Sequence, residues 1–206
     1  MYQRDKYKKT DKKYIFDFIN KHPFATLVLQ GERLLATHIP VLPKGNAEHF
    51  VLHGHIAWNN EQYPYLKDGL EALLIFHGAQ GYISSSWYRE KDISTWDYSA
   101  IHVNVKLKLQ TRKELEESLE ILVSHFEKDQ ENPLLYKDLP EDMLKQHLPI
   151  IKGFWGEPVK IEAVAKLHQG FEKEDLKLIT QHLEKTKDSS CLALKKDIEK
   201  ENQQLL

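Results

Sequence analysis

A stretch rich in aromatic, hydroxyl and charged side chains lies between Gly81 and His102, where the sequence reads GYISSSWYREKDISTWDYSAIH. It holds two of the four tryptophans, Trp87 and Trp96, together with three tyrosines and three consecutive serines. Flat rings, hydroxyls and a cation suit a planar ligand that carries a phosphate group. The alternative is that the rings cover a sheet edge or an interface between subunits.

Two histidines, His53 and His55, lie two positions apart in a run that predicts a strand, so both face the same side and could bind a metal ion. Such a pair more often faces solvent or a polar cavity. The single cysteine, Cys191, excludes an internal disulfide and a multi-cysteine metal site. We therefore predict no metal. His55 and Tyr82 are the candidates for a proton donor, and no residue is assigned as catalytic.

Several common site motifs are absent from the sequence. It has no Gly-rich phosphate loop, no Gly-x-Ser-x-Gly nucleophile elbow and no helix pair with a basic recognition face. The net charge of −2 gives no electrostatic footprint for nucleic acid. No apolar run approaches the length of a membrane span. These observations predict a soluble, cytoplasmic protein that does not bind DNA directly.

Short strands separated by turn residues must position the aromatic stretch. The apolar patterns predict strands at 24–29, 34–41, 50–56, 72–76, 99–109 and 159–164, of which 72–76 should be buried on both faces. They predict helices at 12–21, 142–150, 172–187 and 191–206, and a capping box at Thr111–Glu114 opens another helix that runs to about Glu127. A mainly β fold follows, a small antiparallel barrel with flanking helices. We place one domain at 1–170 and a C-terminal helical extension at 171–206.

The sequence resembles the PaiB family of FMN-binding negative transcriptional regulators. The motifs that carry the resemblance are HPFATLV from His22, THIP from Thr37, GHIA from Gly54, and above all GYISSSWY and TWDYSAIHV. The resemblance implies a six-stranded antiparallel split β-barrel, a homodimer, and FMN in a groove at the dimer interface. The cofactor-binding residues carried over by position are Thr26, Thr37, His38, Gly54, His55, Tyr82, Ser84, Ser86, Trp87, Tyr88, Lys91, Thr95, Trp96 and Tyr98, and His102 also matches the pattern.

The chain departs from the family pattern at several positions. Trp58 stands where the family has arginine, and Asn59 begins an altered segment after it. Asp97 replaces an asparagine, and the family's Lys-Leu-Ser-Gln-Asn-Arg appears as Lys-Leu-His-Gln-Gly-Phe, ending at Gly170 and Phe171. Because arginine is the natural bidentate partner of phosphate, we expect FMN binding to be weakened or lost.

Three functions remain open from the sequence. The first is an FMN-binding protein of the PaiB type. The second is a cofactor-free dimeric regulator that kept the barrel and lost FMN. The third is a flavin-dependent reductase of a small molecule, in which the flavin would carry the chemistry.

Overall fold

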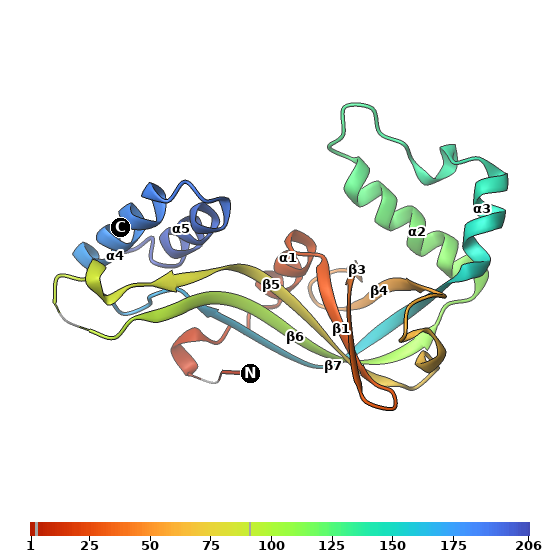
Figure 1. The fold of residues 1–206 in the computed structure, drawn as a ribbon, viewed down its shortest axis with the longest axis horizontal. Helices are drawn as coiled ribbons and strands as arrows, with labels where there is room; N and C mark the ends of the chain where they lie inside the picture. The colour runs from red at the N-terminus through yellow and green to blue at the C-terminus, as the bar shows by residue number, and fades with distance from the viewer. Residues whose placement is uncertain (3, 91) are drawn as a thin grey trace. The chain divides into compact units, whose positions relative to one another are not determined.

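The computed structural model describes residues 1–2, 4–90 and 92–206. Within these ranges seven strands form one sheet, in the order β2-β1-β5-β6-β7-β4-β3 (Figure 1). The strands are β1 (Phe24–Gln30), β2 (Leu34–Pro40), β3 (Leu42–Gly45), β4 (Phe50–Ala57), β5 (Glu71–Ile83), β6 (Thr95–Leu109) and β7 (Ile151–Lys166). The α-helices are α1 (Lys12–Lys21), α2 (Arg112–Glu127), α3 (Glu141–His147), α4 (Lys173–Lys185) and α5 (Ser189–Glu201).

The sheet confirms the predicted fold class, a mainly antiparallel β fold with helical additions. Strand β1 pairs antiparallel with β2 and β5, and β4 pairs antiparallel with β3 and β7. The strand order ends at β2 and β3, so the sheet formed by the described residues is open rather than closed. The strand that the sequence missed is β3. The Val41 amide donates to the Pro23 carbonyl at 2.8 Å, and the chain beyond it pairs with β4.

Local sequence signals explain the clearest elements. In β6, Ile101, Val103, Val105 and Leu107 are at most 1% exposed, while Asn104, Lys106 and Lys108 are exposed, as strict alternation predicts. Helix α2 begins with the predicted capping box, in which Thr111 and Glu114 each bond the other's backbone amide.

Two predictions about the strands around the aromatic stretch are wrong. Leu73 and Ile75 of β5 remain partly exposed, so the strand is buried on one face only. The aromatic stretch is also not one long loop, because β5 continues to Ile83 and β6 begins at Thr95. A hydrogen bond holds the connection between the two strands together: the Ser94 hydroxyl accepts from the Ser85 amide at 2.9 Å.

The chain divides into two compact units, each described by itself. One contains Met1–Ile15, His77–His102 and Glu162–Leu206, and the other contains Phe16–Phe76 and Val103–Ile161. Strands β5, β6 and β7 contribute residues to both. The predicted domain boundary at residue 170 stays a prediction. No helix among the described residues is long and apolar enough to cross a membrane.

The first unit is held together by its two C-terminal helices and its N-terminal segment. Helices α4 and α5 lie side by side (Figure 1) and pack their buried aliphatic side chains on Ile83 of β5 and Ala165 of β7. The N-terminal segment lies along β7, where the Lys9 amide donates to the Ala163 carbonyl at 3.0 Å. The Lys9 ammonium also pairs with Glu201 of α5 at 2.6 Å. These contacts bring the first residues of the chain beside the end of β7.

Candidate functional site

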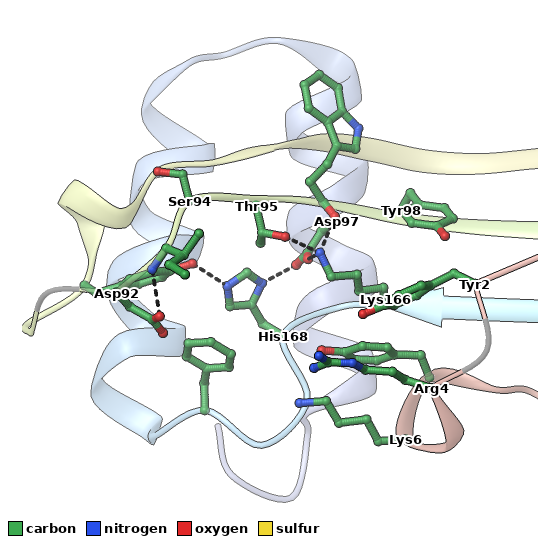
Figure 2. Close-up of a pocket in the computed structure, with 15 residues that line it drawn as sticks. Tyr2, Arg4, Lys6, Asp92, Ser94, Thr95, Asp97, Tyr98, Lys166 and His168 are labelled. Atoms are coloured by element: carbon green, nitrogen blue, oxygen red, sulfur yellow. Dashed lines mark hydrogen bonds and ion pairs between the residues drawn. The ribbon is translucent and has the colours of Figure 1, made fainter.

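A cavity of about 610 Å³ lies within the first unit (Figure 2). Its volume falls in the range of small-molecule sites. The N-terminal segment, the start of β6 and the end of β7 supply its walls. The lining residues are aromatic (Tyr2, Tyr7, Tyr88, Trp96, Tyr98, Phe171), cationic (Arg4, Lys6, Lys166), hydroxyl-bearing (Ser94, Thr95), acidic (Asp92, Asp97), and otherwise Ile93 and His168.

A chain of three polar side chains runs from the cavity wall into the protein. The Tyr88 hydroxyl lies 2.8 Å from Nε2 of His168, and Nδ1 of His168 contacts Oδ2 of Asp97. His168 is 2% exposed and Asp97 is fully buried. Burial, followed by the charge of Asp97, raises the pKa of Tyr88 to about 12. Tyr88 therefore carries its proton at neutral pH.

Lys166 ties the start of β6 to the end of β7. Its ammonium donates to the Thr95 hydroxyl and to the Trp96 carbonyl, the latter at 2.6 Å, and lies 3.7 Å from Oδ1 of Asp97 (Figure 2). The 3.7 Å separation is an ion-pair contact rather than a hydrogen bond, so Oδ1 of Asp97 has no hydrogen-bond donor among the described residues. Burial lowers the pKa of Lys166, and Asp97 opposes that effect.

The backbone that presents His168 is strained. His168 has φ of +58°, a left-handed conformation that few residues other than glycine adopt. The neighbouring Gln169 holds the turn in place, since its amide side chain bonds the Leu167 amide at 2.8 Å and the Ala165 carbonyl at 2.6 Å. Strain that the surroundings enforce is a common mark of functional positions.

The structure brings four of the sequence-predicted site residues together in this cavity, namely Tyr88, Thr95, Trp96 and Tyr98. Four others in the same unit lie outside the lining. Tyr82 is half exposed, with its ring 6.3 Å from that of Trp96, and the Ser84 and Ser86 hydroxyls bond each other at 2.8 Å. Trp87 stacks on His182 of α4 with ring centroids 5.0 Å apart. Lys91 lies outside the described residues.

The remaining carried-over residues belong to the second unit. The Thr26 hydroxyl and His38 bond each other at 3.0 Å, and the Thr37 hydroxyl accepts from Asn60 at 3.0 Å. Gly54 is enclosed, because a Cβ there would lie 3.1 Å from the Pro40 carbonyl oxygen. Burial lowers the pKa of His55. These residues are hydrogen-bonded or packed within β1, β2 and β4.

The two histidines on β4 lie in different surroundings. His53 is fully buried and bonds the Ser118 hydroxyl of α2 at 2.6 Å, while His55 is only partly buried. In the described ranges, no three histidine, cysteine or acidic side chains converge on a position that could hold a metal ion.

Sequence reasoning missed the cations and the histidine of the cavity. Arg4 and Lys6 belong to a basic N-terminal segment that carried no motif. Asp97, His168 and Phe171 were visible only as departures from the family pattern. The signal that could have found the site is that all three departures meet in one cavity, where the Phe171 and His168 rings lie 4.5 Å apart.

Comparison with known proteins places the chain among flavin-related proteins. Residues 1–157 match the model of the family described as "Putative FMN-binding domain". The chain is 31% identical over 185 residues to protease synthase and sporulation protein PAI 2 of Bacillus subtilis, and the match covers 89% of each chain.

Two solved structures resemble the fold. The FAD and heme binding protein of Mycobacterium smegmatis matches with a TM-score of 0.60 at 14% identity, over 82% of this chain and 78% of that one. The flavocytochrome Anf3 of Azotobacter vinelandii matches with a TM-score of 0.56 at 11% identity, over 77% of this chain and 68% of that one. At these identities the likeness shows the fold alone, which is the split-barrel fold that the sequence resemblance implied.

Proposed function

Since the chain belongs to the FMN-binding domain family, we propose that it is a flavoprotein of the PaiB type that binds FMN with the residues of its first-unit cavity. The observation that carries the proposal is the composition of this cavity, which combines aromatic rings, hydroxyl groups and cations. FMN needs a flat apolar surface for its ring system, hydrogen-bonding groups for its ribityl chain and cations for its phosphate. When bound, FMN supplies one- and two-electron redox chemistry.

The phosphate partners in this proposal are Arg4 and Lys6. No ion pair of Arg4 is found among the described residues, whereas Lys166 is already bonded to Thr95 and Trp96. A guanidinium can bind two phosphate oxygens at once. Arg4 thus offers the kind of contact that the chain lacks at Trp58 and Phe171, where the family pattern has arginine.

The flavin ring and ribityl partners are the other residues of the cavity. Trp96 and Tyr98 supply aromatic rings to the lining of the cavity, and Ser94 and Thr95 supply hydroxyl groups. The further positions that we propose as contacts come from the family resemblance rather than from this cavity: Thr26, Thr37, His38, Gly54, His55, Tyr82, Ser84, Ser86, Trp87 and Lys91.

A homodimer, a regulatory role and a cytoplasmic location complete the proposal. The second unit leaves Phe24, Trp58 and Val159 between 62% and 67% exposed, and these apolar side chains are candidates for a subunit interface. The net charge of −2 disfavours direct DNA binding, so regulation would act through another partner. Light scattering that gives a monomer mass at micromolar concentration would contradict the dimer.

Titration of flavin-free protein with FMN, followed by flavin fluorescence, tests the proposal. We expect saturable binding that Arg4→Gln weakens about ten- to hundredfold, because a charge-assisted hydrogen bond contributes about 1.5–3 kcal/mol. The matched control is Arg33→Gln in the second unit, which removes another exposed arginine, one that pairs with Glu61 at 2.8 Å. We expect this control to leave FMN affinity unchanged.

Two results would contradict parts of this proposal. Absence of FMN binding by a folded chain would favour the cofactor-free regulator. Equal affinities of both arginine variants and the parent would place the phosphate away from Arg4.

A further inference from the structure

The chain of Tyr88, His168 and Asp97 has the geometry of a proton relay. A buried carboxylate contacts one nitrogen of an imidazole, and the other nitrogen lies 2.8 Å from a hydroxyl at the wall of a cavity. In catalytic triads a third group orients the base in this way. Asp97 and His168 are buried, while Tyr88 is only partly buried and lines the cavity.

We propose that Tyr88 is the proton donor to a substrate bound in the cavity, with His168 and Asp97 as its positioning and proton-supplying residues. This inference rests on the proposed function, because the substrate class is a quinone or another carbonyl compound that is reduced beside a flavin. It extends that function from cofactor binding to a reductase reaction.

The active state of the relay has His168 as an imidazolium. In this state Nδ1–H donates to Asp97 and Nε2–H donates to the Tyr88 oxygen, so the phenol O–H is free to point into the cavity. With neutral His168, the phenol would donate to Nε2 instead and would not be available to a ligand. The Asp97 carboxylate stabilises the imidazolium by direct contact.

The proposed reaction balances in protons and electrons. The substrate takes two electrons and one proton as a hydride equivalent from a reduced flavin, which is the co-reactant that the proposed function supplies. As the carbonyl π bond breaks, its oxygen gains an electron pair and forms an O–H bond with the proton of Tyr88. Nε2 of His168 returns a proton to Tyr88 and is left as a neutral imidazole, which solvent protons restore between turnovers.

Other charged groups lie near the relay. Asp97 of β6 and Lys166 of β7 face it from the strands. Asp92 and Asp175 contribute negative charge near Tyr88, and Asp175 pairs with Arg89 at 3.3 Å. We expect Asp97→Asn to slow proton donation, because His168 loses the carboxylate that positions its ring.

The first test needs no cofactor. In flavin-free protein at one fixed pH, nitrogen NMR of the histidine rings reports the hydrogen bonds of His168, with His168→Asn to assign its signals. We expect Tyr88→Phe to shift the Nε2 signal of His168, because Nε2 loses its hydrogen-bond partner. The matched control is Tyr136→Phe, since the Tyr136 hydroxyl is buried without a hydrogen-bond partner among the described residues. An unchanged Nε2 signal in Tyr88→Phe would overturn the relay.

The second test separates proton donation from electron transfer. FMN-loaded protein is reduced with dithionite and mixed rapidly with menadione, which needs protons, or with ferricyanide, which takes electrons only. We expect Tyr88→Phe to slow oxidation by menadione at least roughly tenfold, given that general acids typically contribute about 10²–10⁴-fold. Oxidation by ferricyanide should be unchanged.

Each outcome of the second test decides between the two proposals. Loss of the menadione reaction alone in Tyr88→Phe, with a smaller loss of the same reaction in Asp97→Asn, supports the relay. Unchanged rates with both oxidants, or equal slowing with both, would overturn the relay and leave FMN binding intact. If the protein binds no FMN, the proposed function is wrong, and the proposed role of Tyr88 as proton donor is then also wrong.

Discussion

Asp97 and His168 should be energetically coupled, and a double-mutant cycle can measure the coupling. Both residues differ from the family pattern, which has asparagine and serine at these positions, and their side chains contact each other in a fully buried site. Asp97→Asn removes the carboxylate that accepts from His168. His168→Ser leaves that carboxylate buried with only Lys166 nearby, at 3.7 Å. The double variant installs the family pair.

The expected magnitudes follow from burial. Removing one partner of a buried charged pair costs about 3–5 kcal/mol, and losing one hydrogen bond to a charged group costs about 1.5–3 kcal/mol. We expect about 2–3 kcal/mol for Asp97→Asn, whose side-chain oxygen can still accept, and about 3–5 kcal/mol for His168→Ser. The double variant should be destabilised by about 2 kcal/mol less than the sum, within the range measured for contacting residues.

Urea unfolding followed by tryptophan fluorescence gives the three free energies. With an m-value of about 3 kcal/mol/M, His168→Ser should lower the midpoint by about 1–1.7 M. The control cycle uses Arg33 and Glu61, which also pair at 2.8 Å but are each more than 60% exposed. Exposed pairs typically couple by about 0.2–1 kcal/mol. Additivity of Asp97→Asn and His168→Ser within about 0.5 kcal/mol would refute the reasoning.

Two further predictions concern the second unit and the turns. Burial lowers the pKa of His53 to about 4 from 6.5, so the unfolded chain binds the proton more tightly. Stability should be full above pH 6.5 and fall by about 2 kcal/mol at pH 5, a fall that His53→Asn removes and the exposed-site control His49→Asn keeps. Gly45 and Gly170 both have positive φ, but only at Gly45 would a Cβ meet backbone, 2.3 Å from the His49 carbonyl oxygen. Thermal unfolding should therefore show Gly45→Ala to be more destabilising than Gly170→Ala, which should cost about 1 kcal/mol.

The sequence predicted the elements whose signals are local. The capping box at Thr111 and Glu114 defines the start of α2 within four residues, and the alternation in β6 is complete within one strand. The fold class followed from the count of such elements. Strand β3 was missed because it has four residues, two of which are Pro43 and Gly45, and a tertiary contact rather than local preference makes it a strand.

The cavity could be predicted only in part, because its contacts join distant segments. Tyr88 and Trp96 were named from a motif whose two halves lie close together in the sequence. His168 meets Asp97 and Tyr88 across 71 and 80 residues, and Arg4 reaches the same cavity from the other end of the chain. Periodicity and spacing in one sequence do not predict contacts between such distant residues. The only indication of these contacts was that some of the residues depart from the family pattern.

The structure changes the interpretation of the residues that depart from the family pattern. Taken one at a time, an acid in place of asparagine and a phenylalanine in place of arginine both weaken a phosphate site. In the structure, the negative charge of Asp97 is engaged by His168 and lies near Lys166, so it does not face a ligand as an unpaired charge. Phe171 packs against the rings of His168 and Tyr88, so it is part of the same cluster. Phe171, the change that removes a cation, thus packs against two members of the proposed relay, and Arg4 supplies a cation to the same cavity.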